Sequence, residues 1–249
     1  MPALIKNKKK HLKTIIVLPT YNEAENIPIL VKTISALNIA DLHLMVIDDN
    51  SPDGTGQISE ELQKEYGDLI LVRHRAKRMG LGSAYRLGFT EALSLGADAI
   101  GQMDSDLSHP PEKLPEMIET LKNTDVVIGS RYIEGGSVDQ NWPLWRKALS
   151  AWGNFYARTI LGLPLRDVTG GFRLWSRKAL TSMPMERIVS NGYVFQVETA
   201  YVANRLGLKL KEVPIYFADR KWGISKMNWR IQVEAAWRVW YALIDFRDL

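Results

Sequence analysis

The first half of the chain alternates short apolar segments with amphipathic ones, and this alternation constrains the fold more than any other feature. Residues 14–19 (TIIVLP) are apolar and rich in β-branched side chains, which is typical of a buried parallel strand. Residues 27–37 then carry apolar side chains at helical spacing on one face. The same pattern predicts further strands at residues 43–48, 69–73, 97–103 and 125–130, with helices between them at about 56–66, 83–95 and 112–122. Such an order favours an α/β fold with an open, mostly parallel central sheet and helices on both faces.

The second half follows a different pattern. It is predicted to contain a Trp- and Arg-bearing helix at 142–163, a loop at 167–173, a helix at 192–206, an extended segment at 209–217, a loop at 219–226 and a last helix at 228–245. No internal repeat, low-complexity tract or clear linker interrupts the chain. We therefore expect a single domain over residues 1–249, with residues 1–13 as a basic N-terminal extension.

Composition narrows the classes of function. The 32 basic and 28 acidic side chains leave a formal charge of +4, which favours an anionic partner such as a nucleotide, a phosphate or a membrane surface, although a solvated basic surface is an open alternative. No nucleic-acid-binding signature is present, so we expect no nucleic-acid partner. The chain has no cysteine, which excludes disulfides, thiolate zinc sites and cysteine nucleophiles. No apolar stretch approaches the roughly 18 residues of a membrane span, and no signal-peptide core follows the basic start, so we expect a soluble or peripheral protein.

Polar residues follow four of the predicted strands, at the edge where open α/β sheets bind their ligands. These sets are Tyr21–Asn22–Glu23, Asp48–Asp49, Asp104–Ser105–Asp106 and Arg131. A carboxylate at Asp48–Asp49 can accept hydrogen bonds from a base or ribose, and a simple strand-end turn is an equally open reading. The four sets together predict one shared crevice.

The pair Asp104 and Asp106 indicates a metal site. Two carboxylates two residues apart in a loop can turn toward one hard cation, and Mg²⁺ or Mn²⁺ prefers oxygen ligands that it shares with phosphates. Such a cation neutralises the charge that grows on a departing diphosphate. Turn acids or a helix N-cap before Pro110 are the alternative, but the position at a strand end beside other acids and an arginine favours the metal.

Two further segments have a functional and a structural interpretation. The loop at 219–226 carries Arg220 and Lys226 around Gly223, and it either closes over a diphosphate or is a solvated charged loop. The helix at 142–163 is predicted to place apolar side chains on one face, namely Trp145, Leu149, Trp152, Tyr156, Ile160 and Leu163. With the last helix at 228–245, it is a candidate amphipathic membrane-interface helix, or else a core helix. The four histidines lack metal-ligand spacing, so they are predicted to be structural or surface residues: His11, His43, His74 and His109.

Eight segments in order carry a resemblance to a known family. They are LPTYNEAENI (18–27), IDDNSPDGT (47–55), GLGSAY (80–85), MDSDLSHPPE (103–112), GSRY (129–132), TGGFRLW (169–175), GYVFQVE (192–198) and DRKWGISK (219–226). Together they strongly resemble dolichyl-phosphate mannose synthases, also called polyprenol-phosphate mannosyltransferases, of glycosyltransferase family 2. The resemblance covers residues 14 to about 226 and implies the GT-A type nucleotide-sugar-binding fold.

The resemblance implies inverting transfer of mannose from GDP-mannose to a polyprenyl (dolichyl) phosphate, with Mg²⁺ or Mn²⁺ as cofactor and polyprenyl β-D-mannosyl phosphate as product. By position, the residues expected to hold guanosine are Pro19, Tyr21, Glu23, Ile47 and Asp49. The residues expected at the diphosphate, metal and sugar are Asp104, Ser105 and Asp106. Arg220 and Lys226 are expected on the donor phosphates, and Arg131 and Arg166 on the acceptor phosphate.

The chain departs from this family pattern in three places. Ser108 stands where some relatives have a glutamine that helps to bind metal, and Gly170 stands where some have a serine near the acceptor phosphate. Many relatives also carry C-terminal membrane helices, whereas no segment of this chain is predicted to span a membrane. It therefore resembles the shorter, catalytic-domain-only members. We expect it to lie in the cytoplasm, peripheral to the cytoplasmic face of a membrane, with a separate membrane-anchoring protein as a compatible partner.

Two alternative functions stay open at this stage. One keeps the chemistry and changes the donor, as in transfer from UDP-glucose or a related donor to undecaprenyl phosphate. The other is a non-catalytic nucleotide-sugar-binding or membrane scaffold on the same fold. The complete Asp104–Asp106 pair and the complete loop at 219–226 favour an enzyme.

Overall fold

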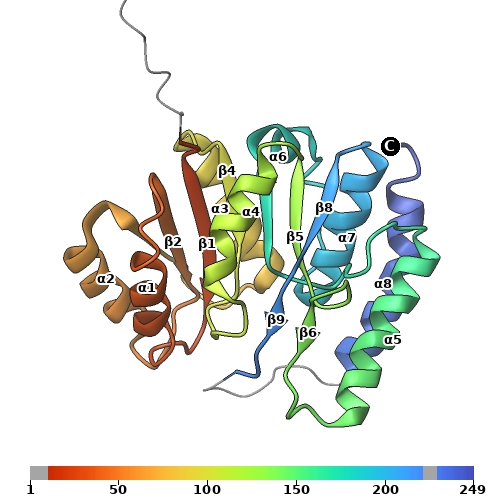
Figure 1. Cartoon of the computed structure of the whole chain (residues 1–249), viewed down its shortest axis with the longest axis horizontal. Helices are drawn as coiled ribbons and strands as arrows, with labels where there is room; N and C mark the ends of the chain where they lie inside the picture. The colour runs from red at the N-terminus through yellow and green to blue at the C-terminus, as the bar shows by residue number, and fades with distance from the viewer. Residues whose placement is uncertain (1–10, 221–228) are drawn as a thin grey trace, which may run out of the picture.

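The computed structural model describes residues 11–220 and 229–249, and Figure 1 shows a central sheet covered by helices on both faces. The sheet has seven strands in the order β3-β2-β1-β4-β7-β5-β8. The parallel strands are β1 (Thr14–Thr20), β2 (Leu42–Asp48), β3 (Ile70–His74), β4 (Ala99–Gln102), β5 (Val126–Ser130) and β8 (Leu210–Pro214). The prediction of an α/β fold with a mostly parallel central sheet is confirmed.

Two apolar cores fill the space between the sheet and its helices. Alternate residues of β1 point to opposite faces, so Ile15 and Val17 pack in one core whereas Ile16 and Leu18 pack in the other. The first core lies under α3 (Leu81–Ser94), α6 (Arg177–Ser182), α7 (Gly192–Arg205), α5 (Leu144–Ile160) and α8 (Trp229–Asp245). The second lies under α1 (Ile27–Ser35), α2 (Thr55–Tyr66) and α4 (Leu114–Leu121). Short elements complete the chain: η1 (Gly67–Leu69), η2 (Pro111–Lys113), β6 (Ser137–Val138) and β9 (Tyr216–Phe217).

The strand β7 (Arg173–Ser176) has no counterpart in the sequence analysis, which ended a loop at residue 173. It runs antiparallel to both of its neighbours, β4 and β5, so these two strands remain parallel to each other. Its first residue, Arg173, is fully buried, and its guanidinium donates hydrogen bonds to the carbonyls of Gly170, Gln196 and Val168. Burial lowers the pKa of Arg173 to about 10. A four-residue strand that begins with a charged side chain offers little apolar pattern to detect.

The exposed face of α5 differs from the predicted one. Leu144, Trp145, Trp152 and Phe155 are exposed, whereas Leu149, Tyr156 and Ile160 are half-buried and Leu163 is buried. The predicted ends of this helix are also wrong, because Trp142 and Leu163 are buried outside it. The exposed face differs because α8 packs beside α5 (Figure 1) and covers the flank that carries Tyr156. Trp240 Nε1 donates a hydrogen bond to Tyr156 Oη at 3.0 Å.

In the part of the chain that the structure describes, the helices are each too short or too polar to cross a membrane.

Two glycines in helices offer a matched test of how tightly α3 packs on the sheet. A Cβ at Gly88 would lie 2.4 Å from Val17 Cγ1, whereas a Cβ at Gly153 in α5 would have no atom within 4 Å. Gly88→Ala should lower the free energy of unfolding by about 1–3 kcal/mol through overpacking. Gly153→Ala should raise it by up to about 1 kcal/mol, because alanine has the higher helix propensity. Urea unfolding measures both, and an unchanged stability for Gly88→Ala would contradict the close packing of α3 on β1.

Candidate functional site

The carboxyl ends of β1, β2, β4 and β5 meet at one edge of the sheet, the lower edge in Figure 1. Contacts at this edge join segments that are distant in sequence. Ser105 Oγ donates to the carbonyl of Pro19 at 3.0 Å, and the amide of Asp49 donates to the carbonyl of Thr20 at 3.1 Å. The edge therefore brings together the polar sets that follow β1, β2 and β4, as predicted from the order of the strands.

Asp106 is the more buried of the two acids that follow β4. Its Oδ1 accepts hydrogen bonds from the amide of Ser108 at 3.1 Å and from Ser108 Oγ at 2.6 Å. Its Oδ2 lies 3.1 Å from Nη2 of Arg220. The side chain of Asp106 is 9% exposed and that of Asp104 is 35% exposed, so Asp104 is the carboxylate that is more open to solvent.

Asp104 is surrounded by Tyr85 and His109. Tyr85 Oη donates to Asp104 Oδ1 at 3.3 Å, and the amide of Asp104 donates to Nδ1 of His109 at 3.0 Å. Burial is the main reason that the pKa of Asp104 is raised, and the charge of Asp106 adds to this effect, whereas His109 and Arg220 oppose it. Two like charges are thus held near each other in a partly dry site.

The donor chemistry at this pair fits a hard divalent cation. Carboxylate oxygens are the ligands that Mg²⁺ and Mn²⁺ prefer, and a cation would relieve the repulsion between Asp104 and Asp106. Residues 11–220 and 229–249 contain no cluster of three or more His, Cys, Asp or Glu side chains that could hold a metal. Further ligands would therefore come from phosphates or water, as is usual for Mg²⁺. Ser108 lies against the pair but directs its hydroxyl hydrogen to Asp106, so its role as a ligand stays a prediction.

Three of the predicted guanosine residues lie at the open end of β1. Pro19 is half-buried and its carbonyl is occupied by Ser105. The ring of Tyr21 lies under the guanidinium of Arg78, with 4.8 Å between the guanidinium carbon and the ring centroid. Glu23 accepts a hydrogen bond from the side chain of Asn26 at 2.7 Å. Their contact with a nucleoside stays a prediction.

The other two predicted guanosine residues are buried. The side chain of Ile47 is fully enclosed beneath α3, and its carbonyl accepts a hydrogen bond from Thr20 Oγ1 at 3.3 Å, so only its main chain could approach a base. Asp49 is ion-paired with Arg75 and accepts the amide of Met79 at 3.2 Å. Asp49 therefore anchors the segment before α3, and any contact with a base would be shared with Arg75.

Arg131 follows β5 and is held by a carboxylate that the sequence analysis did not assign. Its Nε and Nη2 donate to Oδ2 and Oδ1 of Asp167 at 2.7 and 2.8 Å, and Nη2 also donates to Thr169 Oγ1 at 2.7 Å. Burial opposes the charge of Arg131, but the charge and hydrogen bonds of Asp167 raise its pKa above the ordinary value. The same pairing lowers the pKa of Asp167 against the effect of its own burial. The guanidinium is thus fixed in direction and largely neutralised.

The segment after α5 carries the other two predicted acceptor residues. The side chain of Arg166 is exposed, and the amides of Arg166 and Asp167 donate to the two carboxylate oxygens of Glu212, each at 2.8 Å. Gly170 is buried, with its amide donating to Asp167 Oδ1 at 3.0 Å, and a Cβ at this position would lie 3.0 Å from the carbonyl of Gly129. Glycine therefore allows the turn to pack against β5.

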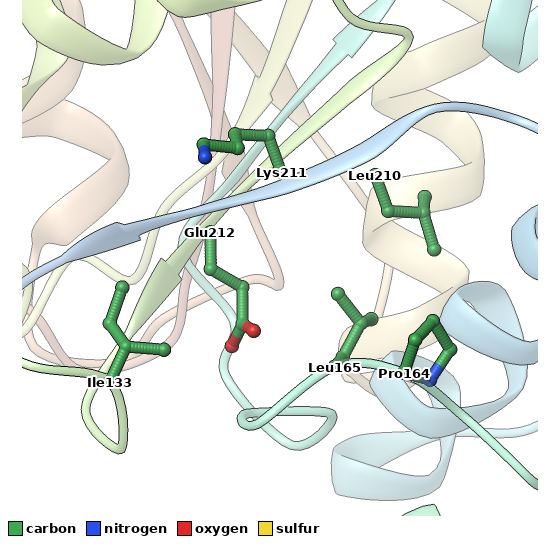
Figure 2. Close-up of a pocket in the computed structure, with 6 residues that line it drawn as sticks. All are labelled: Ile133, Pro164, Leu165, Leu210, Lys211 and Glu212. Atoms are coloured by element: carbon green, nitrogen blue, oxygen red, sulfur yellow. The ribbon is translucent and has the colours of Figure 1, made fainter.

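A pocket of about 300 Å³ lies beside this segment. Figure 2 shows Glu212 extending from β8 between Ile133 on one side and Leu165 on the other. The remaining lining residues are Pro164, Leu210 and Lys211. Because Glu212 also holds the amides of residues 166 and 167, this wall of the pocket supports the loop that carries Arg166.

Arg220 stands between the acidic pair and the start of α5. The amide of Ala218 donates to the carbonyl of Ser108 at 3.1 Å, while Asp219 accepts a hydrogen bond from Arg146 at 3.1 Å. The amide of Asp219 in turn donates to Asp139 at 3.1 Å. These contacts of Ala218 and Asp219 fix the backbone just before Arg220 against the loop after β4 and the start of α5. Lys226, the other predicted donor-phosphate residue, lies outside the described residues.

A family model described as "Glycosyl transferase family 2" matches residues 15–183, which is more than half of the chain. The chain belongs to glycosyltransferase family 2. Among curated relatives, it is 39% identical to the polyprenol monophosphomannose synthase of Mycolicibacterium smegmatis, over 91% of this chain and 85% of that protein. It is 40% identical to the undecaprenyl-phosphate mannosyltransferase of Micrococcus luteus, over 90% of this chain and 91% of that protein.

Solved structures share the fold of this family 2 chain at low sequence identity. A mannosyltransferase from Pyrobaculum calidifontis in complex with GDP-Man and Mn²⁺ superposes with a TM-score of 0.65 at 16% identity, covering 95% of this chain and 65% of that one. Glucosyl-3-phosphoglycerate synthase from Mycobacterium tuberculosis, in complex with Mn²⁺, UDP and glucosyl-3-phosphoglycerate, superposes with a TM-score of 0.64 at 21% identity, covering 94% and 79%. These matches confirm the fold.

Two residues at the site of this glycosyltransferase were missed by the sequence analysis. Asp167 was noted only as part of a loop, and its buried ion pair joins it to Arg131, 36 residues away, so no local pattern in the sequence indicates it. His109 was interpreted as structural or surface, yet it contacts Asp104. Its position directly after the Asp104–Ser108 segment was the available signal.

Asp106→Asn should abolish tight metal binding while the fold survives, because the amide keeps the volume but loses the charge. Even residues that only support metal ligands cost about 10- to 100-fold in affinity, so we expect a loss of more than about 100-fold for a ligand. Titration of Mn²⁺ by electron paramagnetic resonance, with GDP present, measures this loss. Glu119→Gln, at an exposed acid of α4, is the control, and equal Mn²⁺ affinity in both variants would contradict the assignment.

Proposed function

We propose that this chain transfers mannose from GDP-mannose to a polyprenyl phosphate with inversion, giving a polyprenyl β-D-mannosyl phosphate. The observation that carries the proposal is the pair Asp104 and Asp106, flanked at one sheet edge by Arg220. Arg131 follows β5 at the same edge. The names of the two curated relatives, a polyprenol monophosphomannose synthase and an undecaprenyl-phosphate mannosyltransferase, support the same chemistry.

On the donor side, Asp104 and Asp106 would hold Mg²⁺ or Mn²⁺. A bound cation of this kind would supply charge neutralisation for the departing diphosphate. Arg220 contacts Asp106, and its side chain would turn from this carboxylate to a phosphate oxygen when the donor binds. Lys226 is proposed as a second donor to the phosphates, in agreement with its place in the family motif.

On the acceptor side, no general base is required. The second pKa of a phosphate monoester is about 6, so the group is already anionic at neutral pH. One of its oxygens attacks the anomeric carbon of mannose while the bond from that carbon to the diphosphate oxygen breaks, and the electron pair leaves with GDP. Attack on the face opposite to the leaving group inverts the configuration.

Arg131 and Arg166 would orient the acceptor phosphate in different ways. Arg131 is buried and neutralised by Asp167, so it offers a fixed hydrogen-bond direction and adds little net charge. Arg166 is exposed, so it would supply the net positive charge that attracts the phosphate. The amide of Gly170 donates its hydrogen bond to Asp167, so this residue would contribute to the site through the shape of its backbone turn. Arg166 directly precedes Asp167, the residue that pairs with Arg131, so the two proposed phosphate-binding arginines are linked through this segment.

The outer face of α5 and α8 supports membrane docking. We call it the aromatic surface, defined by Leu144, Trp145, Trp152, Phe155, Trp237, Trp240, Tyr241 and Ile244, which are 51–82% exposed. The two helices lie side by side at one flank of the molecule (Figure 1). Exposed aromatic side chains at this density are typical of a surface that enters lipid headgroups. We propose that the protein is peripheral to the cytoplasmic face of a membrane, alone or with an anchoring partner.

The proposal is tested by incubation with radiolabelled GDP-mannose, Mn²⁺ and either a polyprenyl phosphate or the matching polyprenol. We expect β-linked mannosyl lipid from the phosphate and none from the alcohol, because the alcohol lacks an anionic nucleophile. Efficient transfer to the polyprenol, or an α-linked product, would contradict the mechanism. Preferential use of UDP-glucose in a parallel arm would contradict the proposed donor.

Arg166→Ala sharpens the acceptor assignment, because an exposed side chain can be removed at little cost in stability. We expect a higher KM for the polyprenyl phosphate with unchanged affinity for GDP. Lys178→Ala, at a cation of α6 that is 80% exposed, is the matched control and should change neither. Loss of GDP affinity in Arg166→Ala would move this residue to the donor site.

Trp145→Ser combined with Trp152→Ser should weaken binding to anionic liposomes by about 10-fold or more, since burial of a large apolar side chain contributes about 1.5–3 kcal/mol. GDP affinity should stay unchanged. Leu95→Ser, at an exposed apolar residue outside the aromatic surface, is the control. Liposome flotation measures the binding, and a double variant that floats as well as the parent would contradict membrane docking by this surface.

A further inference from the structure

His109 lies beside the acidic pair in a position that the ring cannot easily leave. Its side chain is 1% exposed. Phe172 stacks on it with 5.2 Å between ring centroids, and Phe217 meets it edge-on at 5.4 Å. The aromatic partners come from the turn before β7 and from β9, so the imidazole is clamped between two separate segments.

The hydrogen bonds of His109 define which of its nitrogens carries the proton. The amide of Asp104 donates to Nδ1 at 3.0 Å, so Nδ1 presents a lone pair and the hydrogen of the neutral ring is on Nε2. Nε2 lies 4.0 Å from Oδ2 of Asp104. Burial lowers the pKa of His109, in agreement with a neutral ring. Both nitrogens of the imidazole therefore lie near Asp104, with Nδ1 at its main-chain amide and Nε2 on the side of its carboxylate.

The first of these contacts constrains the backbone from which the carboxylate of Asp104 projects. An amide buried without a partner costs about 1–3 kcal/mol, so the Nδ1 acceptor fixes the backbone of Asp104 in the turn after β4. Tyr85 holds Oδ1 on the other side at 3.3 Å. A ring with its only lone pair already used is not available as a metal ligand, and a buried ring is poorly placed to exchange protons with solvent. What remains is a role through Asp104.

We propose that His109 is a positioning residue that holds Asp104 in the orientation needed to bind the divalent cation, through its Nδ1 acceptor. The inference rests on the proposed donor site. It assigns to His109 no contact with the substrate and no proton transfer. The expected consequence is a loss of metal affinity in a chain that still folds, because the effect lies in the direction of one carboxylate.

Three substitutions separate the two ring nitrogens. His109→Phe keeps an aromatic ring between Phe172 and Phe217 but removes both nitrogens. His109→Asn places an amide oxygen close to the position of Nδ1, where it can accept the amide of Asp104. His109→Gln places an amide nitrogen close to the position of Nε2 and offers no acceptor at Nδ1. His43→Phe, at a half-buried histidine on the far edge of the sheet, is the control for loss of an imidazole elsewhere.

The measurement is the dissociation constant of Mn²⁺ by electron paramagnetic resonance with GDP present, together with the thermal unfolding of each variant. We expect His109→Phe to weaken Mn²⁺ binding by about 10- to 100-fold, the range for residues that orient metal ligands. His109→Asn should recover most of this loss, whereas His109→Gln should not. His43→Phe should bind Mn²⁺ like the parent.

Two results would overturn the inference. The first is parent-like Mn²⁺ affinity in His109→Phe, which would leave the ring a purely structural role visible only in thermal unfolding. The second is recovery by His109→Gln and not by His109→Asn, which would place the effect at Nε2. A parent protein that binds GDP but no Mn²⁺ would instead contradict the proposed function itself, so the two failures are distinguishable.

Discussion

Repulsion between two carboxylates at the end of β4 is the constraint that organises the site. Asp104 and Asp106 are held near each other by the turn that follows the strand, and the charge of one raises the pKa of the other. Nearby groups offset part of this charge, since Arg220 and Ser108 both donate to Asp106 and Tyr85 donates to Asp104. A divalent cation that also binds the donor diphosphate would neutralise the negative charge that remains on the two carboxylates.

The positive groups are arranged unequally around this pair. Arg131 is buried and neutralised by Asp167, which also accepts the amide of Gly170 and so shapes the turn before β7. Arg166 and Arg220 keep partly or fully exposed side chains. The reaction involves two phosphate groups at one sugar carbon: the acceptor phosphate that attacks it and the donor diphosphate that leaves. A guanidinium of fixed direction, together with arginines that are more exposed, suits the binding and orientation of these two groups.

The site is also joined to the aromatic surface by direct contacts. Arg146, near the start of α5, pairs with Asp219, the residue before Arg220. Its guanidinium also lies 3.7 Å from the centre of the Trp142 ring, which in turn meets Phe217 edge-on. Phe217 packs against His109. The helix proposed to enter the lipid headgroups therefore begins within a few contacts of the acidic pair.

Much of this architecture could be predicted because its signals are local. The alternation of apolar runs located β1 to β5 within one or two residues, and polar residues after strand ends located Asp104 and Asp106. What was missed depends on contacts between distant segments. Asp167 pairs with Arg131, which is 36 residues away in sequence. The short strand β7 pairs with both β4 and β5. Helix α8 covers Tyr156, so the exposed face of α5 differs from the one that its own sequence predicts. No periodicity within one segment reports such partners.

The central claim is that Asp104 and Asp106 form a cation site completed by the donor diphosphate. The most direct measurement is anomalous diffraction at the manganese edge from crystals grown with GDP and Mn²⁺. The account predicts a manganese peak between the two carboxylates and the diphosphate, with Arg220 moved from Asp106 toward a phosphate oxygen. A manganese peak elsewhere, or GDP bound at this edge with both aspartates free of metal, would contradict it.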